Sequence, residues 1–317
     1  MKLYQNALFL LLLSFTVPAY LEASLHNQPR FAQVDTVKPG NGNSKVIAPN
    51  AELQLISKQF KFTEGPATDK KGNVFFTDQP NNKIWKYDIK GRLSVFMDSS
   101  GRSNGMYFDK KGNLLSCADE HNQLWSITPQ KKVTVLVKDF RGQLLNGPND
   151  VWVDPKGNIY FTDPLYPRPY WQNRKSDIEK ERVYSIRRGS NEPVIAADSI
   201  VKPNGIIGTP DGKFLYVADA KDSIIYRFQI SPDGTLINQT VFVKARADGM
   251  TIDNQGNIYL AGNGITVYNS NGEQIEHIDV PSRWTANLTF GGKDRKDLFV
   301  TASESVYKIR MKVKGVN

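Results

Sequence analysis

Short apolar stretches alternate with polar turns along most of the chain, and one such repeat occurs six times. Each repeat opens on a polar residue and continues with a short apolar stretch, a turn related to Asp-x-x-Gly-Asn, and a second apolar and aromatic stretch. The repeats begin 39 to 55 residues apart. A period of roughly 43 residues with strand-like chemistry is typical of β-propeller blades. The six repeats are Glu64–Asp78, Asn104–Ala118, Asn149–Asp163, Asn204–Asp219, Asp248–Ala261 and Asn287–Thr301.

The polar turn inside each repeat predicts a β-hairpin, because Asp favours the start of such turns and Gly supplies a positive φ. An EF-hand loop is a poorer interpretation, since further carboxylates and a closing glutamate are missing. Leu93–Phe96 and Val133–Leu136 indicate a fourth, outer strand in their blades. A third strand is expected after each repeat, at 83–88, 123–127, 182–186, 223–228, 264–268 and 305–309.

The stretch Glu52–Ile56 precedes the first repeat, and only a few residues follow the last predicted strand. We expect this stretch to complete the sixth blade, which closes the ring and hides the sheet edges. The predicted fold class is therefore all-β: a six-bladed propeller with four-stranded antiparallel blades.

The residue that opens each repeat is the candidate for chemistry. Because innermost strands surround the central channel of a propeller, these six side chains should converge at one end of it. All six carry a carboxylate or amide oxygen, which suits Ca²⁺ or another hard divalent ion. Turn chemistry alone explains any single position but explains six poorly, since Glu is uncommon in turns. The six are Glu64, Asn104, Asn149, Asn204, Asp248 and Asn287.

The amino-acid composition excludes several kinds of metal and disulfide site. The 317 residues include one cysteine, Cys117, and three histidines, which excludes a disulfide framework, a multi-cysteine metal site and a His-rich metal site. Cys117 falls in an apolar strand and is interpreted as a core residue rather than a nucleophile. The net charge of +9 is scattered, with no basic stripe or stacking platform for nucleic acid.

The first residues resemble an export signal. Lys2 precedes the apolar run Ala7–Ala19, and small residues stand at Ala19 and Ala23, as in a cleavable signal peptide. A buried core helix is the alternative. We expect residues 1–23 to be a signal peptide, 24–50 a flexible leader and 51–317 the propeller. No other long apolar run occurs, so we expect a secreted or periplasmic protein without a membrane span.

At this point the sequence resembles a known family, the gluconolactonases, regucalcin (senescence marker protein) and related six-bladed lactonases. The resemblance covers about residues 52–311 and is carried by the segments 64–66, 146–150, 161–164, 202–205, 247–250 and 290–292. It implies a divalent metal, usually Ca²⁺, held by Glu64, Asn149, Asn204 and Asp248. It also implies that Asp248 acts as the general base and that Asn149 helps to hold substrate.

The same resemblance extends to blade two, where Asn104-Gly105 and Glu120-His121 match the family pattern. An insertion at 164–173 accounts for the longest repeat spacing and is rich in proline and aromatic residues. We interpret it as a wall of the substrate pocket, although a rigid loop packed on its own blade is an alternative. The wall candidates are Tyr166, Tyr170 and Trp171, with Arg168 placed to bind an acidic group. The predicted substrate-binding residues are Asn104, Asn149, His121, Tyr166, Arg168 and Asn287.

Together these observations predict an exported Ca²⁺-dependent lactonase acting on a sugar-type lactone, with Zn²⁺, Mn²⁺ or Mg²⁺ as alternative ions. The metal would polarise the lactone carbonyl while Asp248 deprotonates the attacking water. A metal-dependent phosphotriesterase or arylesterase is a second reading, and a non-catalytic ligand-binding propeller is a third. The oligomeric state, monomer or dimer, is left open.

Overall fold

The computed structural model describes residues 44–171 and 176–316. The predicted signal peptide (1–23) and most of the predicted leader (24–50) lie outside the described residues. Within the described ranges, no helix is long and apolar enough to cross a membrane.

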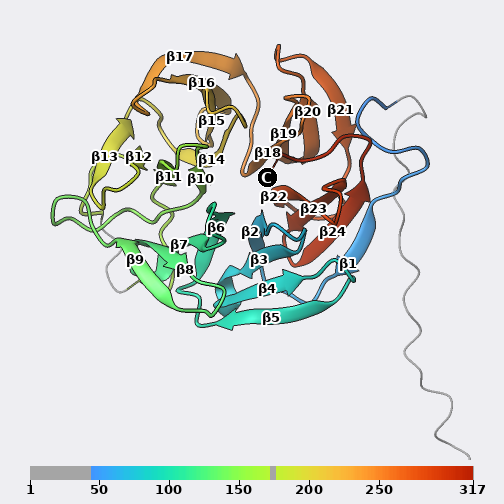
Figure 1. Cartoon of the computed structure of the whole chain (residues 1–317), viewed down its shortest axis with the longest axis horizontal. Coiled ribbons are helices and arrows are strands. Elements are labelled where there is room, and N and C mark those ends of the chain that lie inside the picture. The colour runs from blue at the N-terminus through green and yellow to red at the C-terminus, as the bar shows by residue number, and fades with distance from the viewer. Residues whose placement is uncertain (1–43, 172–175, 317) are drawn as a thin grey trace, which may run out of the picture. The chain divides into compact units, whose positions relative to one another are not determined.

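Six four-stranded antiparallel sheets surround a common axis, as the repeats predict (Figure 1). Blade one contains β2 (Thr63–Thr68), β3 (Val74–Asp78), β4 (Lys83–Tyr87) and β5 (Leu93–Asp98). Blade two contains β6 (Ser103–Phe108), β7 (Leu114–Ala118), β8 (Gln123–Ile127) and β9 (Val133–Val137). Blade three contains β10 (Val151–Val153), β11 (Ile159–Asp163), β12 (Arg182–Ile186) and β13 (Pro193–Ala197).

The remaining blades follow the same order from the axis outward. Blade four contains β14 (Pro203–Gly208), β15 (Phe214–Asp219), β16 (Ile224–Ile230) and β17 (Leu236–Val243). Blade five contains β18 (Met250–Ile252), β19 (Ile258–Gly262), β20 (Gly264–Tyr268) and β21 (Gln274–Ile278). Blade six contains β22 (Thr285–Gly291), β23 (Asp297–Ala302), β24 (Ser305–Arg310) and β1 (Gln54–Ser57).

The ring closes where the sequence predicts it. Strand β1 pairs antiparallel with β24, with Gln54 opposite Lys308, so the N-terminal strand completes the blade formed by the C-terminal strands. The pairing satisfies the outer edge of β24 and joins the two ends of the described propeller.

The hairpin turns have the predicted chemistry. In blade three, Asp154 Oδ1 accepts the backbone N–H groups of Lys156 and Asn158, each at 2.8 Å, and Asn158 Nδ2 donates to Asp154 Oδ2 at 2.7 Å. Gly157 has a φ of +93°, a region that glycine adopts without strain. Asp69 makes the same set of bonds in blade one.

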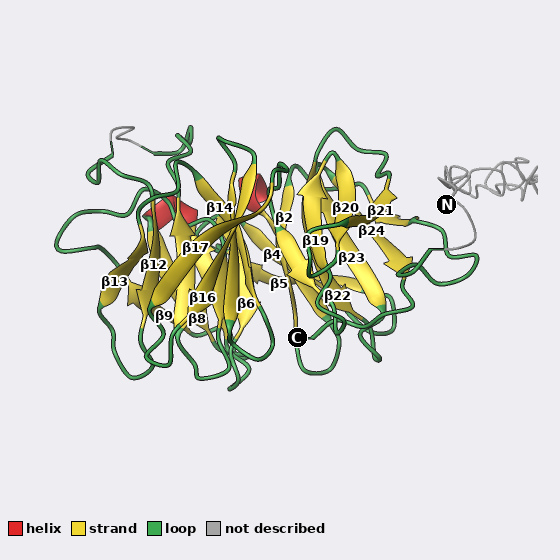
Figure 2. Ribbon diagram, turned by 90° about the horizontal axis from the view of Figure 1, so that it is seen from above, coloured by secondary structure: helices red, strands yellow, loops and turns green. Residues whose placement is uncertain are grey.

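The core lies between the faces of neighbouring blades. Its largest buried side chains include Phe76, Phe161, Tyr184 and Phe299, each fully buried. Burying one such ring contributes about 1.5–3 kcal/mol, so blade-to-blade packing holds the inner strands in place. Two short 3-10 helices, η1 (Gln79–Asn81) and η2 (Asp119–His121), lie at one end of the propeller, and the last described residues lie at the other (Figure 2).

Candidate metal and active site

The residues that open the repeats stand at the start of the innermost strands. Glu64, Asn104 and Asn204 are each the second residue of their strand, whereas Asn149 and Asp248 lie just before β10 and β18. The first residues of neighbouring repeats are linked by backbone hydrogen bonds. For example, Gly105 N donates to the Asn149 carbonyl oxygen at 2.7 Å. Backbone bonds between inner strands therefore set the spacing of these side chains.

Glycine follows four of the six opening residues because the next inner strand passes very close. A Cβ added to Gly65 would lie 2.0 Å from the Asn104 carbonyl oxygen, and one added to Gly205 would lie 2.3 Å from that of Asp248. A side chain cannot fit at these distances without moving the backbone. The Glu-Gly, Asn-Gly and Asp-Gly pairs thus serve two purposes: a polar side chain at the channel and a close strand contact behind it.

Five of the six opening residues line one pocket of about 230 Å³. The sixth, Asn287, is buried next to them, because a Cβ added to Gly249 would lie 2.0 Å from Asn287 Cγ. The pocket is lined by Phe62, Glu64, Gln79, Asn104, Asn149, Tyr166, Arg168, Asn204, Ala220, Arg246, Ala247, Asp248 and Trp284.

Three carboxyl groups crowd the ring. Burial and the neighbouring Asp248 and Asp150 raise the pKa of Glu64 well above its ordinary value. Burial is also the main cause that raises the pKa of Asp248, against hydrogen bonds from Trp284 and Asn204 that lower it. Burial, with a smaller repulsion from Asp248, raises the pKa of Asp150 to about 7. Groups that repel one another in this way gain stability from a bound cation.

Asp150 was not predicted from the sequence. It stands where four other repeats have glycine, and its side chain is buried against Gly105 of the neighbouring inner strand. Its Oδ1 accepts the Val151 N–H at 2.9 Å, and its Oδ2 accepts the Ile206 N–H at 3.3 Å. The signal that could have identified it is the pair Asn149-Asp150 in place of Asn-Gly.

Trp284 and Arg246 also belong to the site and were not predicted. Trp284 Nε1 donates a hydrogen bond of 2.6 Å to Asp248 Oδ2, which fixes the orientation of that carboxylate. The Arg246 guanidinium lies 4.8 Å from the centre of the Trp284 ring. These contacts join residues 36 or more positions apart, so no local sequence pattern marks them.

The insertion in blade three reaches the pocket through two of its predicted residues. The Tyr166 hydroxyl accepts a hydrogen bond of 3.0 Å from Asn204 Nδ2, and Arg168 lines the pocket. Lys202 of blade four donates to the Leu165 carbonyl oxygen at 2.9 Å. The alternative of a loop packed only on its own blade is therefore wrong for residues 164–171.

Tyr170 and Trp171 do not line the pocket as expected. The Tyr170 hydroxyl donates to Asp119 Oδ2 at 2.6 Å, and Trp171 Nε1 donates to the Asp119 carbonyl oxygen at 3.0 Å. Both rings hold the insertion against blade two, because Asp119 is a buried carboxylate that attracts donors. They therefore support the wall rather than form it.

His121 is not brought to the pocket either. Its ring is exposed and stacks on Trp125 of β8 with 5.4 Å between ring centres. Cys117 is buried in β7, and burial raises the pKa of its thiol well above the ordinary value. It is a core residue, as predicted.

The donor chemistry of the ring fits a hard divalent cation. Asn104 Oδ1 is buried and has no hydrogen-bond partner, an arrangement that costs free energy unless a ligand or ion satisfies it. Across the described ranges, no three His, Cys, Asp or Glu side chains come close enough to hold a metal. A site here would depend on amide as well as carboxylate oxygens, which Ca²⁺ accepts and zinc sites seldom use.

Comparison with known proteins agrees with this geometry. Residues 62–304 match the model of the SMP-30/gluconolactonase/LRE-like region. The chain belongs to this family. A curated relative, the gluconolactonase of Zymomonas mobilis, is 27% identical over 303 residues, covering 85% of this chain and 84% of the relative.

Solved structures of the family share the fold. One assigned as a gluconolactonase has a TM-score of 0.80 and 28% identity, covering 86% of this chain and 96% of its own. The gluconolactonase of Xanthomonas campestris has a TM-score of 0.77 and 24% identity, covering 87% of this chain and 99% of its own. At 24% identity, the similarity to the Xanthomonas campestris structure supports the fold alone.

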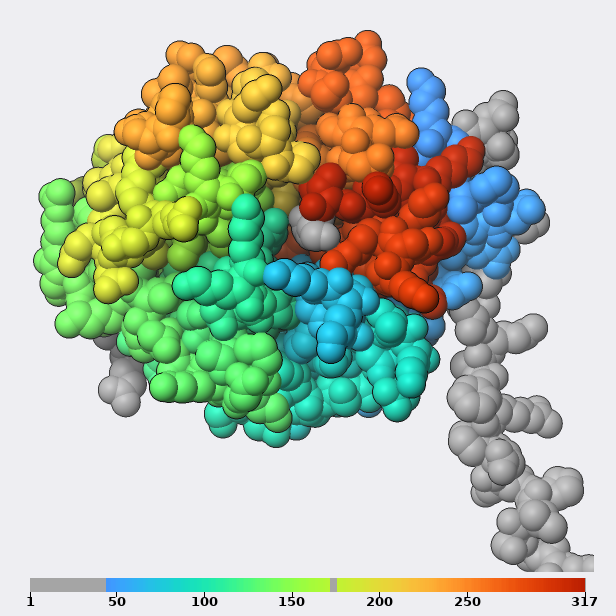
Figure 3. Space-filling view, viewed as in Figure 1, coloured from blue at the N-terminus to red at the C-terminus, as the bar shows by residue number. Residues whose placement is uncertain are grey.

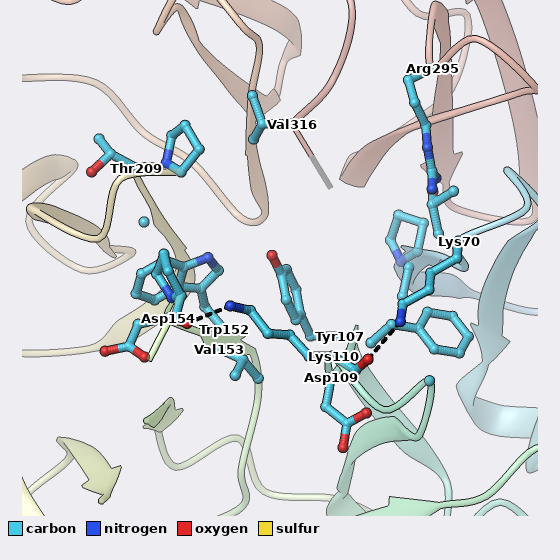
Figure 4. Close-up of a pocket in the computed structure, with 18 residues that line it drawn as sticks. Lys70, Tyr107, Asp109, Lys110, Trp152, Val153, Asp154, Thr209, Arg295 and Val316 are labelled. Carbon is cyan, nitrogen blue, oxygen red and sulfur yellow. Dashed lines mark hydrogen bonds between the residues drawn. The ribbon is translucent and has the colours of Figure 1, made fainter. Parts of the chain in front are cut away.

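The opposite end of this family member holds a second pocket of about 320 Å³ (Figure 4). Figure 3 shows this end of the molecule, with the blades arranged around its centre. Lysines here bind the next blade: Lys70 Nζ donates to the Lys110 carbonyl oxygen at 2.6 Å, and Lys110 Nζ to that of Pro155 at 2.5 Å. The acidic side chain of Asp154 is used in its hairpin turn. This end therefore holds the blades together, whereas the ring end carries the candidate metal ligands.

Proposed function

We propose that this protein is an exported, Ca²⁺-dependent lactonase that hydrolyses a sugar-type lactone. One observation supports this most strongly. The opening residues of all six blades meet at one end of the channel, five of them around a single pocket, in a chain that belongs to the gluconolactonase family. The curated relative from Zymomonas mobilis is a gluconolactonase, which favours lactone hydrolysis over the phosphotriesterase and the non-catalytic alternatives.

The metal ligands in this proposal are Glu64, Asn149, Asn204 and Asp248. A bound Ca²⁺ would polarise the lactone carbonyl and offset the negative charge that develops on its oxygen. Asn104 lies beside the ligands with its amide oxygen unpartnered, and so can accept a hydrogen bond from a substrate hydroxyl. Tyr166 closes the same side of the pocket through its bond to Asn204.

Asp248 is the proposed general base. Trp284 holds its Oδ2, which leaves Oδ1 to take a proton from water at the reacting carbonyl. Burial raises the pKa of Asp248 above its ordinary value in the metal-free site, whereas a bound Ca²⁺ would lower it and favour the ionised form that accepts a proton. Such a base contributes about 10²–10⁴-fold to the rate.

The test uses D-glucono-1,5-lactone and an aryl phosphotriester, assayed with chelator and with Ca²⁺, Zn²⁺, Mn²⁺ or Mg²⁺ restored. We expect Ca²⁺-dependent lactone hydrolysis above the spontaneous rate, and a loss of at least 100-fold in Asp248→Asn. Asp211→Asn, a change in an exposed turn, is the matched control and should retain the rate. Lactone turnover that survives both chelation and Asp248→Asn contradicts the proposal, and preferential turnover of the phosphotriester favours the second reading.

Export is tested separately. The full chain, expressed with a C-terminal tag, should be recovered outside the cytoplasm with a new N-terminus after Ala19 or Ala23. Recovery of the intact N-terminus in the cytoplasm would contradict this part of the proposal.

A further inference from the structure

Two arginines lie at the pocket in addition to the ring. Arg168 comes from the blade-three insertion, and Arg246 precedes β18 of blade five; both line the pocket with Asp248. These two arginine side chains are more exposed to solvent than the carboxylates of the ring. Glu64 and Asp150 are buried, whereas Arg168 is half-buried and Arg246 is exposed. The pocket is therefore acidic at its depth and basic at its mouth.

Arg168 is held in a fixed orientation. Its Nε donates to Asp119 Oδ2 at 2.7 Å, and Asp119 is only 2% exposed. The same Oδ2 accepts hydrogen bonds from Gln79 Nε2 at 2.9 Å and from the Tyr170 hydroxyl at 2.6 Å. Gln79 of η1 and Tyr170 of the insertion therefore hold this carboxylate, and the carboxylate holds the Arg168 guanidinium through its Nε edge. The terminal Nη groups of Arg168 make no hydrogen bond to other described residues.

Asp119 does more than neutralise Arg168. A guanidinium that is already ordered loses little side-chain entropy when it binds a ligand, which strengthens binding. Because the Nε edge is occupied by Asp119, the two Nη groups remain for an anion with two or more oxygens. Asp119 is thus a positioning residue, and Arg168 is the group that it presents.

Arg246 approaches from another blade. It lies over the Trp284 ring at 4.8 Å and forms no ion pair within the described part of the chain. Its contact with Trp284 places it beside the residue that holds Asp248, the proposed base. The charge of Arg246 attracts the Asp248 carboxylate and so lowers its pKa, but unlike Arg168 its guanidinium is not held by a hydrogen-bonded carboxylate within the described residues.

We propose that this pocket selects lactones that carry a second, negatively charged group, a carboxylate or a phosphate, remote from the reacting carbonyl. This inference rests on the lactonase function proposed above. The reacting carbonyl would lie at the ring, and the anionic group at the mouth between Arg168 and Arg246. A neutral sugar lactone offers no anionic oxygen to the Nη groups of Arg168 or to the guanidinium of Arg246. An anionic lactone satisfies them with charge-assisted hydrogen bonds, which are about twice as strong as neutral ones.

The activity test compares D-glucono-1,5-lactone with 6-phospho-D-glucono-1,5-lactone, which differ only in the phosphate, and adds D-glucaro-1,4-lactone as a carboxylate substrate. We expect kcat/KM to be at least tenfold higher for one anionic lactone than for the neutral one. Arg246→Gln and Arg168→Gln should each reduce this ratio at least fivefold. Arg283→Gln, a nearby exposed arginine outside the pocket, is the matched control.

Asp119→Asn separates positioning from a structural role. It should raise KM for the anionic lactone at least fivefold with a smaller change in kcat, because the guanidinium is present but no longer fixed. An equal fall of kcat for both substrates would indicate damage to the fold instead. Preference for the phosphate over the carboxylate, or the reverse, identifies which anionic group the mouth accepts.

A binding measurement keeps the inference testable if no lactone is hydrolysed. Calorimetry with 6-phosphogluconate, glucarate and gluconate should show at least tenfold tighter binding of 6-phosphogluconate or glucarate, which carry a second anionic group, than of gluconate, and a loss of that difference in Arg246→Gln. Equal affinity for all three, or a ratio unchanged by both arginine variants, overturns the inference while leaving the lactonase proposal intact. Selective binding of 6-phosphogluconate or glucarate, without hydrolysis of any of the lactones, contradicts the lactonase proposal instead.

Discussion

The substitution Asp150→Asn tests whether the metal-free ring buries a carboxylate whose negative charge no cation offsets. Asp150 has a pKa of about 7 in the folded protein against an ordinary 3.8. Between these values the folded state keeps a proton that the unfolded state has lost. The free energy of unfolding of the metal-free protein therefore falls as the pH rises from about 4 to about 7, and this group adds no further change above that.

The size of the effect follows from that window. One pKa unit corresponds to about 1.4 kcal/mol, so the roughly 1.5 units between pH 5.5 and a pKa of about 7 are worth about 2 kcal/mol. Asparagine carries no charge at either pH, and its Oδ1 can still accept the Val151 N–H. It loses the longer bond from Ile206, at 3.3 Å, at a cost of about 1 kcal/mol at both pH values.

The assay is urea unfolding of chelator-treated protein at pH 5.5 and pH 8.5. Relative to wild type, Asp150→Asn should gain about 2 kcal/mol in unfolding free energy between pH 5.5 and pH 8.5. Asp211→Asn is the control, because hydrogen bonds lower the pKa of that exposed carboxyl and it stays ionised throughout. A difference between Asp150→Asn and wild type that is the same at both pH values would refute the reasoning.

Two further changes test the geometry of the ring. Gly205→Ala places a Cβ 2.3 Å from the Asp248 carbonyl oxygen, so we expect a loss of about 1–3 kcal/mol in unfolding free energy and weaker Ca²⁺ binding, both measurable by thermal melting with and without Ca²⁺. A variant as stable as wild type would contradict the close strand contact. Trp284→Phe removes the 2.6 Å hydrogen bond to Asp248 Oδ2, a bond that lowers the pKa of this base. The acid limb of the kcat/KM profile should therefore move to higher pH, and an unmoved limb would show that Trp284 does not act on Asp248.

The repeats were enough to predict the blades and most of the ring. Period, turn chemistry and the opening polar residues are local features, and closure by Glu52–Ile56 follows from counting strands. The structure confirms the six blades, with β1 on β24, and brings Glu64, Asn104 and Asn149 to one pocket. Because every blade of a propeller has the same orientation to the axis, a position within the repeat predicts a position at the axis. Local sequence patterns were therefore enough to predict most of the ring.

What could not be predicted depends on side chains that meet across blades. Asp119 holds Arg168, 49 residues away, and Trp284 holds Asp248, 36 residues away. No spacing rule links such pairs. His121 is not among the residues that line the pocket, because a family pattern gives a position in the chain and not the neighbours of its side chain, which here is stacked on Trp125.

The central claim is that the ring holds one divalent ion on which lactone hydrolysis depends. The most direct measurement is a Ca²⁺ titration of chelator-treated protein, with ion binding and hydrolysis of the preferred lactone followed on the same sample. We predict one ion per chain, a rate that rises in proportion to the bound fraction, and at least tenfold weaker binding in Glu64→Gln. Full hydrolysis before any Ca²⁺ is bound, or unchanged Ca²⁺ affinity in Glu64→Gln, would contradict the claim.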